Sequence, residues 1–168
     1  MDPVEIERKY LIKMPDAALL SALPSSSIEQ VYILSPEGRR ERIRRRVFAN
    51  GIVYTHTVKK RLNDLSRIEI ENEISEEEYR ALLERADPTR RTIEKERYLY
   101  HFDGQLFEID VFPFWDDRAL MELELVDEAQ EIRLPPEIRI VREVSSDGRY
   151  TNSAIAREIP RDTLENEV

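Results

Sequence analysis

The residues most able to do chemistry stand near the N-terminus, between Val4 and Tyr10. Side chains alternate between the two faces of an extended strand, so Glu5, Glu7 and Lys9 point in the same direction. Two carboxylates two residues apart on one strand face are separated by about 7 Å and can share a divalent cation. A lysine one step further can hold a phosphate beside that cation. This stretch therefore predicts a strand that carries a metal and phosphate site.

Charged residues share a strand face at several further places in the chain. The cationic groups are Arg42, Arg44 and Arg46, then Lys59 after Thr57, then Lys95 and Arg97, and the anionic groups are Glu69 and Glu71, then Glu108 and Asp110, then Glu122 and Glu124. The residues of opposite parity are mostly apolar, for example Ile43, Ile109 and Leu123. Each strand is thus expected to have one ionic face and one apolar face.

This alternation has two interpretations. In an open antiparallel sheet, the apolar face packs on the core and the charged face lies in water. In a closed sheet, the charged faces lie inside, where like charges repel unless counterions or ligands intervene. The separation of charge sign by strand and the number of strands beside few helices favour the closed sheet. Such an interior calls for Mg²⁺ or Mn²⁺ on the carboxylates and a polyanion on the arginines and lysines.

The elements that must position these residues follow from turn and periodicity signals. Asn50-Gly51 predicts a hairpin, a second hairpin is expected around 102–105, and Ser75 with Glu78 forms a capping box. The expected strands cover 4–10, 30–34, 40–48, 52–60, 67–74, 91–101, 106–112, 120–126 and 138–144. The expected helices cover 15–23, 75–87, 127–132 and 152–159, with a turn at 35–38 and a loop at 25–27. The aromatic residues Tyr98, Phe107, Phe112 and Trp115 are expected on the outer wall or under a helix.

Length and composition limit the class of protein. The 168 residues suit one domain over 1–160, with a polar C-terminal tail over 161–168. A formal net charge of −9 argues against a nucleic-acid-binding surface. The chain has no cysteine, no apolar run long enough to span a bilayer and no secretion signal. We therefore expect a cytoplasmic protein without a membrane or nucleic-acid partner, present as a monomer or a homodimer.

The ordered motifs resemble those of the CYTH, or triphosphate tunnel metalloenzyme, family. Glu5-Ile6-Glu7-Arg8-Lys9 fits that family's ExExK signature, and the likeness extends over most of the chain. The matching strands are Arg42-Ile43-Arg44, Thr57-Val58-Lys59, Glu69-Ile70-Glu71, Lys95-Glu96-Arg97, Glu108-Ile109-Asp110 and Glu122-Leu123-Glu124, followed by a closing segment from Arg149 to Asn152. The chain is most similar to compact bacterial members that act as tripolyphosphatases.

The resemblance implies an α+β, mainly β fold: a closed eight-stranded antiparallel barrel with a charged tunnel and a few short flanking helices. It also implies Mg²⁺ or Mn²⁺ as cofactor and hydrolysis of the phosphoanhydride bond of tripolyphosphate or a related triphosphate. The implied metal ligands are Glu5, Glu7, Asp110, Glu122 and Glu124, and the implied phosphate contacts are Lys9, Arg42, Arg44, Lys59, Lys95, Arg97 and Arg149. Glu5, Glu7, Lys95 and Arg97 form the implied catalytic set, with less defined roles for Glu69, Glu71, Arg46 and Glu108.

The chain departs from the family at one position and leaves other functions open. Many members carry a lysine in the terminal helix where Ser153 stands here, so Arg149 or Arg157 is expected to replace that phosphate contact. The same tunnel could serve an adenylyl cyclase or a thiamine triphosphatase, or bind polyphosphate without catalysis. The sequence specifies no adenine pocket, and the intact carboxylate set argues against a binding module.

Overall fold

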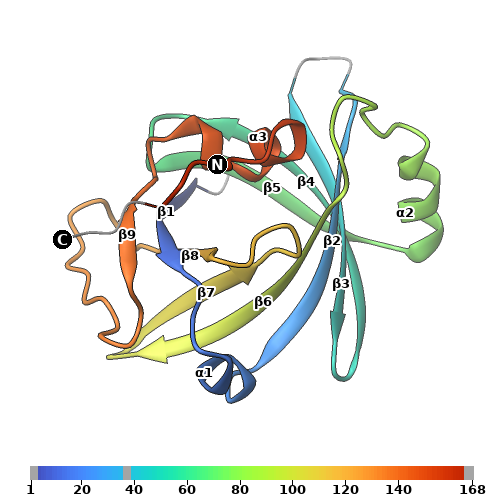
Figure 1. Cartoon of the computed structure of the whole chain (residues 1–168). Coiled ribbons are helices and arrows are strands. Elements are labelled where there is room, and N and C mark those ends of the chain that lie inside the picture. Colours follow the sequence, from blue (N-terminus) through green and yellow to red (C-terminus); the bar gives the residue numbers. More distant parts are fainter. Residues whose placement is uncertain (1–3, 36–38, 165–168) are drawn as a thin grey trace.

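The computed structural model describes residues 4–35 and 39–164 (Figure 1), so part of the turn expected at 35–38 lies outside the described residues. The strands are β1 (Val4–Lys13), β2 (Ser25–Ile33), β3 (Arg40–Phe48), β4 (Gly51–Arg61), β5 (Ser66–Ile74), β6 (Ile93–Phe102), β7 (Gln105–Val111), β8 (Arg118–Glu124) and β9 (Ile140–Glu143). The helices are α1 (Ala17–Ser21), α2 (Glu76–Leu83) and α3 (Asn152–Arg157), with a 3₁₀ turn η1 at Gly148–Tyr150.

The strands form one antiparallel sheet that closes on itself, which confirms the predicted barrel. Their order is β5-β4-β3-β2-β6-β7-β8-β1, and the sheet closes where β1 pairs with β5. One edge of β1 pairs with β8 along Glu7 to Lys13. The other edge is divided, because Val4 to Ile6 pair with β5 and Tyr10 to Ile12 pair with β9. The ninth strand is therefore an addition to the eight-stranded barrel.

Local sequence explains the hairpins and the clearest helix. The turn between β6 and β7 has two central residues, Asp103 and Gly104, whose φ angles are 49° and 74°. Such turns suit the twist of a two-residue hairpin and favour Asp-Gly. At α2, the Ser75 side chain accepts from the backbone of Glu78, whose side chain in turn accepts from the backbone of Ser75, as the capping box predicts. Tyr79 on α2 packs with Val31, Ile33 and Ile43 on the outer wall.

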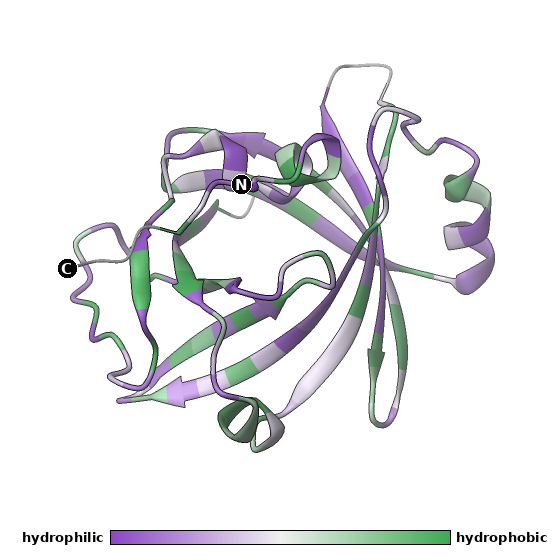
Figure 2. Ribbon diagram, viewed as in Figure 1, coloured by the Kyte–Doolittle hydropathy of each residue, from purple (hydrophilic) through white to green (hydrophobic). Residues whose placement is uncertain are grey.

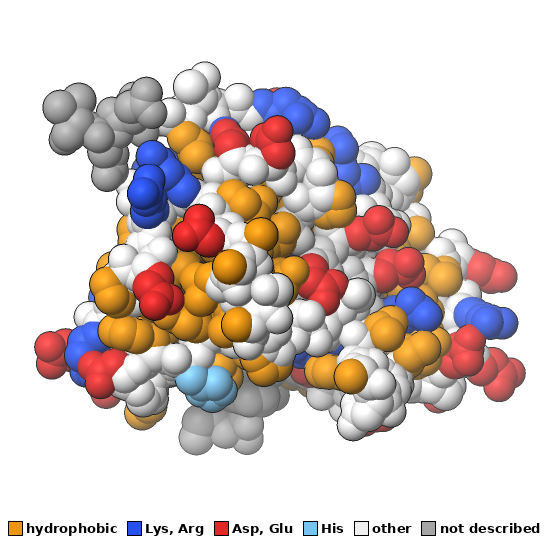
Figure 3. Space-filling view, turned by 60° about the horizontal axis from the view of Figure 1, so that its bottom comes forward, with side chains coloured by type: hydrophobic (Ala, Val, Ile, Leu, Met, Phe, Trp, Pro, Cys, Tyr) orange, Lys and Arg blue, Asp and Glu red, His pale blue; other side chains and the backbone are white. Residues whose placement is uncertain are grey.

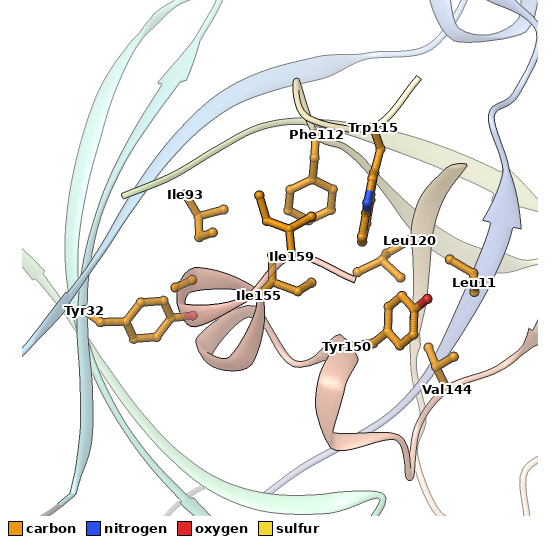
Figure 4. Packing of buried hydrophobic residues seen from close by; sticks show 11 residues of the cluster. Leu11, Tyr32, Ile93, Phe112, Trp115, Leu120, Val144, Tyr150, Ile155 and Ile159 are labelled. Carbon is orange, nitrogen blue, oxygen red and sulfur yellow. The ribbon is translucent and has the colours of Figure 1, made fainter. Parts of the chain in front are cut away.

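Three apolar clusters lie on different sides of the barrel wall. The cluster of Tyr79 with Val31, Ile33 and Ile43 covers β2 and β3. A second cluster covers β1, β7 and β8 from outside, with Leu20 of α1 and Ile138 packed on it. A third, which we call the α3 cluster, packs Ile155 of α3 against Leu11, Ile93 and Phe112 (Figure 4). Figure 2 shows the resulting alternation of hydrophilic and hydrophobic residues along the strands. The face in Figure 3 mixes acidic, basic and hydrophobic side chains.

Two predicted elements differ from the structure. Ser25 to Ser27, expected as a loop, belong to β2, because they pair with Glu96 to Tyr98 of β6 and Ser27 donates a hydrogen bond to Glu96 (2.6 Å). Residues 127–132, expected as a helix, form a turn in which the Asp127 carboxylate accepts from the backbone of Ala129 (2.8 Å). Asp side chains that bond to nearby backbone compete with helix formation.

The aromatic residues divide between the two sides of the wall. Phe107 and Tyr98 belong to the outer cluster over β7 and β8, as predicted. Phe112 and Trp115 belong to the α3 cluster, whose strand residues share the inward parity of the charged side chains. At the C-terminus, Asp162 accepts a hydrogen bond from Tyr150 (3.1 Å), and Leu164 packs against the α3 cluster. The predicted tail therefore touches the barrel at 161–164, and 165–168 lie outside the described residues. In the described part of the chain, no helix is long and apolar enough to cross a membrane.

Candidate active site

The inward faces of the strands enclose a cavity of about 240 Å³ with a wall of charged side chains. Its cations are Lys9, Arg40, Arg42, Arg44, Arg46, Lys59, Arg67, Lys95 and Arg97, and its carboxylates are Glu5, Glu7, Glu41, Glu69, Glu71, Glu108 and Glu122. Tyr32, Thr151, Asn152 and Ser153 complete the wall. Most of the predicted charged residues thus converge on one space inside the barrel.

The opening motif on β1 contributes three adjacent groups to this cavity. Lys59 Nζ lies 3.7 Å from Glu5, and Arg67 lies 3.2 Å from Glu7. Lys9 Nζ lies 3.3 Å from Glu122, which is on the neighbouring strand β8 in direct register with Lys9. The motif therefore meets cations and carboxylates from β4, β5 and β8.

A second group of residues joins β6 to β7. Asp110 is fully buried and accepts two hydrogen bonds from the Arg97 guanidinium, at 2.8 and 2.9 Å. Lys95 Nζ lies 2.8 Å from the same carboxylate, and Glu108 lies 2.8 Å from Arg97. Asp110 does not line the cavity. Its position suits a residue that fixes Lys95 and Arg97, which face the cavity in front of it.

The start of α3 closes over the lysines of the site. The backbone carbonyl of Tyr150 accepts from Lys9 Nζ (3.2 Å), and the Asn152 side chain accepts from Lys95 Nζ (3.1 Å). Ser153, where the family resemblance led us to expect a lysine, is buried at the cavity wall. Neither proposed replacement is there, because Arg149 is exposed and bonded to Asp147, and Arg157 is exposed.

Burial shifts the ionisation of the groups that line the cavity. Burial, reinforced by Glu69, raises the pKa of Glu5 to about 8. Burial also raises the pKa of Glu7, and Glu122 adds to that shift. Burial lowers the pKa of Lys59 to about 8 and that of Lys95 to about 7. Burial thus disfavours the charged forms of these groups, and a ligand that brings opposite charges to them would stabilise those forms.

Asp110 shows the opposite behaviour. Burial alone would raise its pKa, but Arg97 and Lys95 outweigh that effect and hold the pKa well below its usual range. A carboxylate that is ionised and bonded to two cations is a stable part of the wall. This suits a positioning role better than the metal-binding role that the family resemblance implied for Asp110.

The predicted set and the observed set overlap but are not identical. Glu124 is exposed and does not line the cavity, and the same holds for Arg149. The cavity includes Arg67 and Arg40, which the motifs did not single out. Both share strand parity with predicted site residues, so alternation alone could have found them. Gln30 and Asn152, which bond to lining cations, are neutral and gave no charge signal.

The carboxylates fit a divalent cation in their chemistry. As the side chains lie, no group of three or more acidic or histidine residues in the described ranges stands close enough together to hold a metal ion. Glu5, Glu7, Asp110 and Glu122 instead form ion pairs with cations, as Glu7 does with Arg67. The Oε2 atom of Glu5 is buried and accepts no hydrogen bond from the described residues, and Lys59 Nζ lies 3.7 Å from it. A buried carboxylate oxygen without a hydrogen bond, among further carboxylates, suits Mg²⁺ or Mn²⁺, which prefer oxygen ligands.

The fold and the site define a class of protein with a closed antiparallel barrel and both carboxylates and cations on its inner wall. The family model of the CYTH domain matches residues 3–157, and the chain belongs to this family. It is 35% identical over 159 residues to an inorganic triphosphatase of Nitrosomonas europaea, covering 93% of this chain and 99% of that protein. It is 34% identical over 154 residues to an inorganic triphosphatase of Acetivibrio thermocellus, covering 91% and 93%. The crystal structure of the inorganic triphosphatase NE1496 superposes with a TM-score of 0.60 at 33% identity, covering 94% and 97%.

Proposed function

We propose that this protein hydrolyses a phosphoanhydride bond of inorganic tripolyphosphate, with Mg²⁺ or Mn²⁺ as cofactor. The observation that carries the proposal is the cavity inside the barrel, to which the described residues present nine cations and seven carboxylates. A linear chain of phosphates is the simplest ligand that satisfies many cations at once, and the carboxylates account for the cofactor. The relatives named above, which act on inorganic triphosphate by name, support the same substrate.

The cations of the chain perform the binding and stabilise the developing charge. Arg42 and Arg44 on β3 and Lys95 and Arg97 on β6, the two strands that flank β2, line the same cavity, so a phosphate chain bound there would be contacted from both strands. Phosphoryl transfer needs little covalent work by the protein and depends on positioning and charge stabilisation. Asp110 holds Lys95 and Arg97 in place, so these donors are fixed before the charge on the leaving phosphate develops.

Three carboxylates of the cavity, Glu5, Glu7 and Glu122, would hold the cofactor. When bound there, a divalent cation neutralises phosphate oxygens and lowers the pKa of a water molecule. The wall limits the access of bulk water to Glu7 and Lys95, because both residues are buried. No side-chain nucleophile is required, since water attacks the phosphorus directly.

The experiment is colorimetric phosphate release from tripolyphosphate, ATP and thiamine triphosphate, each with Mg²⁺ and with Mn²⁺. We expect the fastest release from tripolyphosphate and no release in EDTA. Cyclic AMP formation from ATP without phosphate release would identify a cyclase instead. Binding of tripolyphosphate without any turnover would identify a binding module and reject the proposal. The same assay determines which metal supports turnover better. The cytoplasmic location and the oligomeric state are separate predictions that this assay does not address.

A further inference from the structure

The cations of the cavity differ in the groups that hold them. Most form ion pairs with carboxylates: Lys9 with Glu122, Arg42 with Glu69, Lys59 with Glu5 and Glu69, Arg67 with Glu7, and Lys95 and Arg97 with Asp110. Arg44 is buried at the centre of β3, yet the ion pairs among the described residues do not include it. Asp110 and Glu71 act on Arg44 from a distance, but no carboxylate of the described residues lies within ion-pair distance of its guanidinium.

Arg44 is held by a neutral side chain on the neighbouring strand. Gln30 of β2 stands directly opposite Arg44 in the register of β2 and β3. Its amide oxygen accepts two hydrogen bonds from the guanidinium, from Nε at 3.2 Å and from Nη2 at 2.8 Å. Gln30 itself is fully buried, so this contact is shielded from water.

The orientation of the Gln30 amide follows from chemistry. A guanidinium has only donors, so the amide oxygen must face Arg44 and the amide nitrogen must face away. That nitrogen donates to the hydroxyl of Tyr32 at 2.6 Å. Tyr32 is packed in the α3 cluster, where Figure 4 shows its ring beside α3. Both ends of the amide are thus fixed, and the Arg44 guanidinium is fixed with them.

The next inward-facing arginine on β3, Arg46, has the same kind of support. Arg46 Nε donates to the hydroxyl of Ser26, at 2.8 Å, and Ser26 is also a buried residue of β2. Arg46 also takes no part in the ion pairs of the described residues. The inward face of β2 therefore supplies neutral acceptors to Arg44 and Arg46. The cations that form ion pairs in the cavity take their carboxylates from β1, β5, β7 and β8.

We propose that Gln30 is a positioning residue that fixes Arg44 toward the cavity and leaves its charge available to a phosphate group. A carboxylate at this position would make a stronger, bidentate pair with Arg44, and an incoming phosphate would then have to compete with it. A neutral amide orients the Arg44 guanidinium without competing with a phosphate group for it. The identity of the anion as tripolyphosphate rests on the proposed function, but the role of Gln30 does not require turnover.

The test compares two variants by the affinity for tripolyphosphate in EDTA, measured by isothermal titration calorimetry without turnover. Gln30→Glu keeps the shape and the acceptor but adds a carboxylate beside Arg44. We expect its affinity to fall at least about tenfold, with a shallower dependence on salt, while thermal stability is kept or raised. A residue that only supports the fold would tolerate this change, so equal affinity in Gln30→Glu and wild type overturns the proposal.

Gln30→Met removes the acceptor at nearly constant size and covers the case in which Gln30→Glu fails to fold. We expect weaker binding with the full salt dependence and, in the hydrolysis assay, a raised KM with little change in kcat. Wild-type affinity in Gln30→Met also contradicts the proposal. Ser25→Asp is the matched control, because it adds one negative charge to an exposed position on the same strand. Its affinity should equal that of wild type.

The outcome separates this inference from the proposed function. Suppose that wild type binds tripolyphosphate tightly without metal, that Gln30→Glu loses this binding, and that no metal supports phosphate release. This result would reject the hydrolase proposal and support the positioning role of Gln30. If wild type hydrolyses tripolyphosphate and both Gln30 variants bind it as tightly as wild type does, the hydrolase proposal stands and the positioning role of Gln30 is rejected. Absence of metal-free binding by wild type also overturns the role, because a free charge on Arg44 should attract the anion.

Discussion

The inner wall of the barrel is charged along one stretch and apolar along the next, although the same strands build both. On β1, Glu7 and Lys9 face the cavity, and Leu11, of the same parity, belongs to the α3 cluster. On β8, Glu122 faces the cavity, and Leu120 belongs to the cluster. Strand alternation therefore decides whether a side chain points to the inside or the outside of the barrel. The position along the strand decides whether the inside is charged or apolar there.

The two stretches also differ in what they contribute. Burying charged groups costs desolvation that ion pairs offset only in part, so the charged stretch adds little net stability. The α3 cluster buries large side chains, among them Phe112 and Tyr150, and contributes through apolar burial and packing. We expect substitutions in the first stretch to change activity at nearly constant stability, and substitutions in the second to change stability.

The largest expected effect is in the charged stretch. Glu5→Ala should lower metal-dependent phosphate release by at least about a hundredfold, because it removes a carboxylate that would hold the cofactor. Far-UV circular dichroism and the urea midpoint should remain close to those of wild type. The matched control is Glu124→Gln, an exposed residue outside the cavity, which should keep wild-type turnover. A fully active Glu5→Ala would remove Glu5 from the site.

The second effect is on stability and belongs to the α3 cluster. Ile155 is fully buried, and Ile155→Ala should lower the free energy of unfolding by about 2–4 kcal/mol through lost burial and a residual cavity. Urea unfolding followed by tryptophan fluorescence measures the change. Arg157→Ala, at an exposed position of the same helix, is the control and should stay within about 0.5 kcal/mol of wild type. Equal midpoints for both variants would mean that the cluster does not stabilise the barrel.

The third effect is a pH dependence of cofactor binding. Burial raises the pKa of Glu5 to about 8, so at pH 7 the carboxyl carries a proton that a cation must displace. Apparent affinity for Mg²⁺ should rise by up to about tenfold per pH unit toward pH 8 and level off above it. Calorimetry in buffers of different ionisation enthalpy measures the released proton. Proton release that is unchanged in Glu5→Gln would assign the effect to another group.

The smallest effect is expected for Arg149, which the family resemblance placed among the phosphate contacts. Its guanidinium is exposed and bonded to Asp147, so Arg149→Ala should change KM by less than about twofold. Steady-state kinetics with tripolyphosphate measures the change. A tenfold rise in KM would show that the segment around η1 reaches the substrate and would revise the limits of the charged stretch.

Much of this architecture follows from the order of residue types. Alternation in Glu5, Glu7 and Lys9 predicts an inward ionic face, and the hairpin signal at Asp103-Gly104 predicts the pairing of β6 with β7. The separation of charge sign by strand and the number of strands beside few helices favour the closed sheet, and the family resemblance implies that it has eight strands. The ionic face and the hairpin need only strand periodicity and turn chemistry.

Other features depend on contacts that periodicity does not encode. Asp110 shares the inward parity of the metal-binding candidates, but its depth behind Lys95 and Arg97 depends on how β6 and β7 pack. Gln30 carries no charge, so only its register opposite Arg44 reveals its contact. Ser25 to Ser27 join β2 because a neighbouring strand pairs with them, which overrides the turn preference of serine.

The division of the β1 edge has a consequence for how the molecule assembles. The barrel closes where Val4, Glu5 and Ile6 meet Ile68, Arg67 and Ser66, residues about sixty positions further along the chain. Contacts this distant in sequence carry a large loop-closure cost and form late in folding. This short pairing of β1 with β5 includes Glu5, so the last strand pairing to form also completes the site that would hold the cofactor. A divalent ion bound there would stabilise the pairing of β1 with β5, and amide hydrogen exchange of these residues would slow as the ion binds.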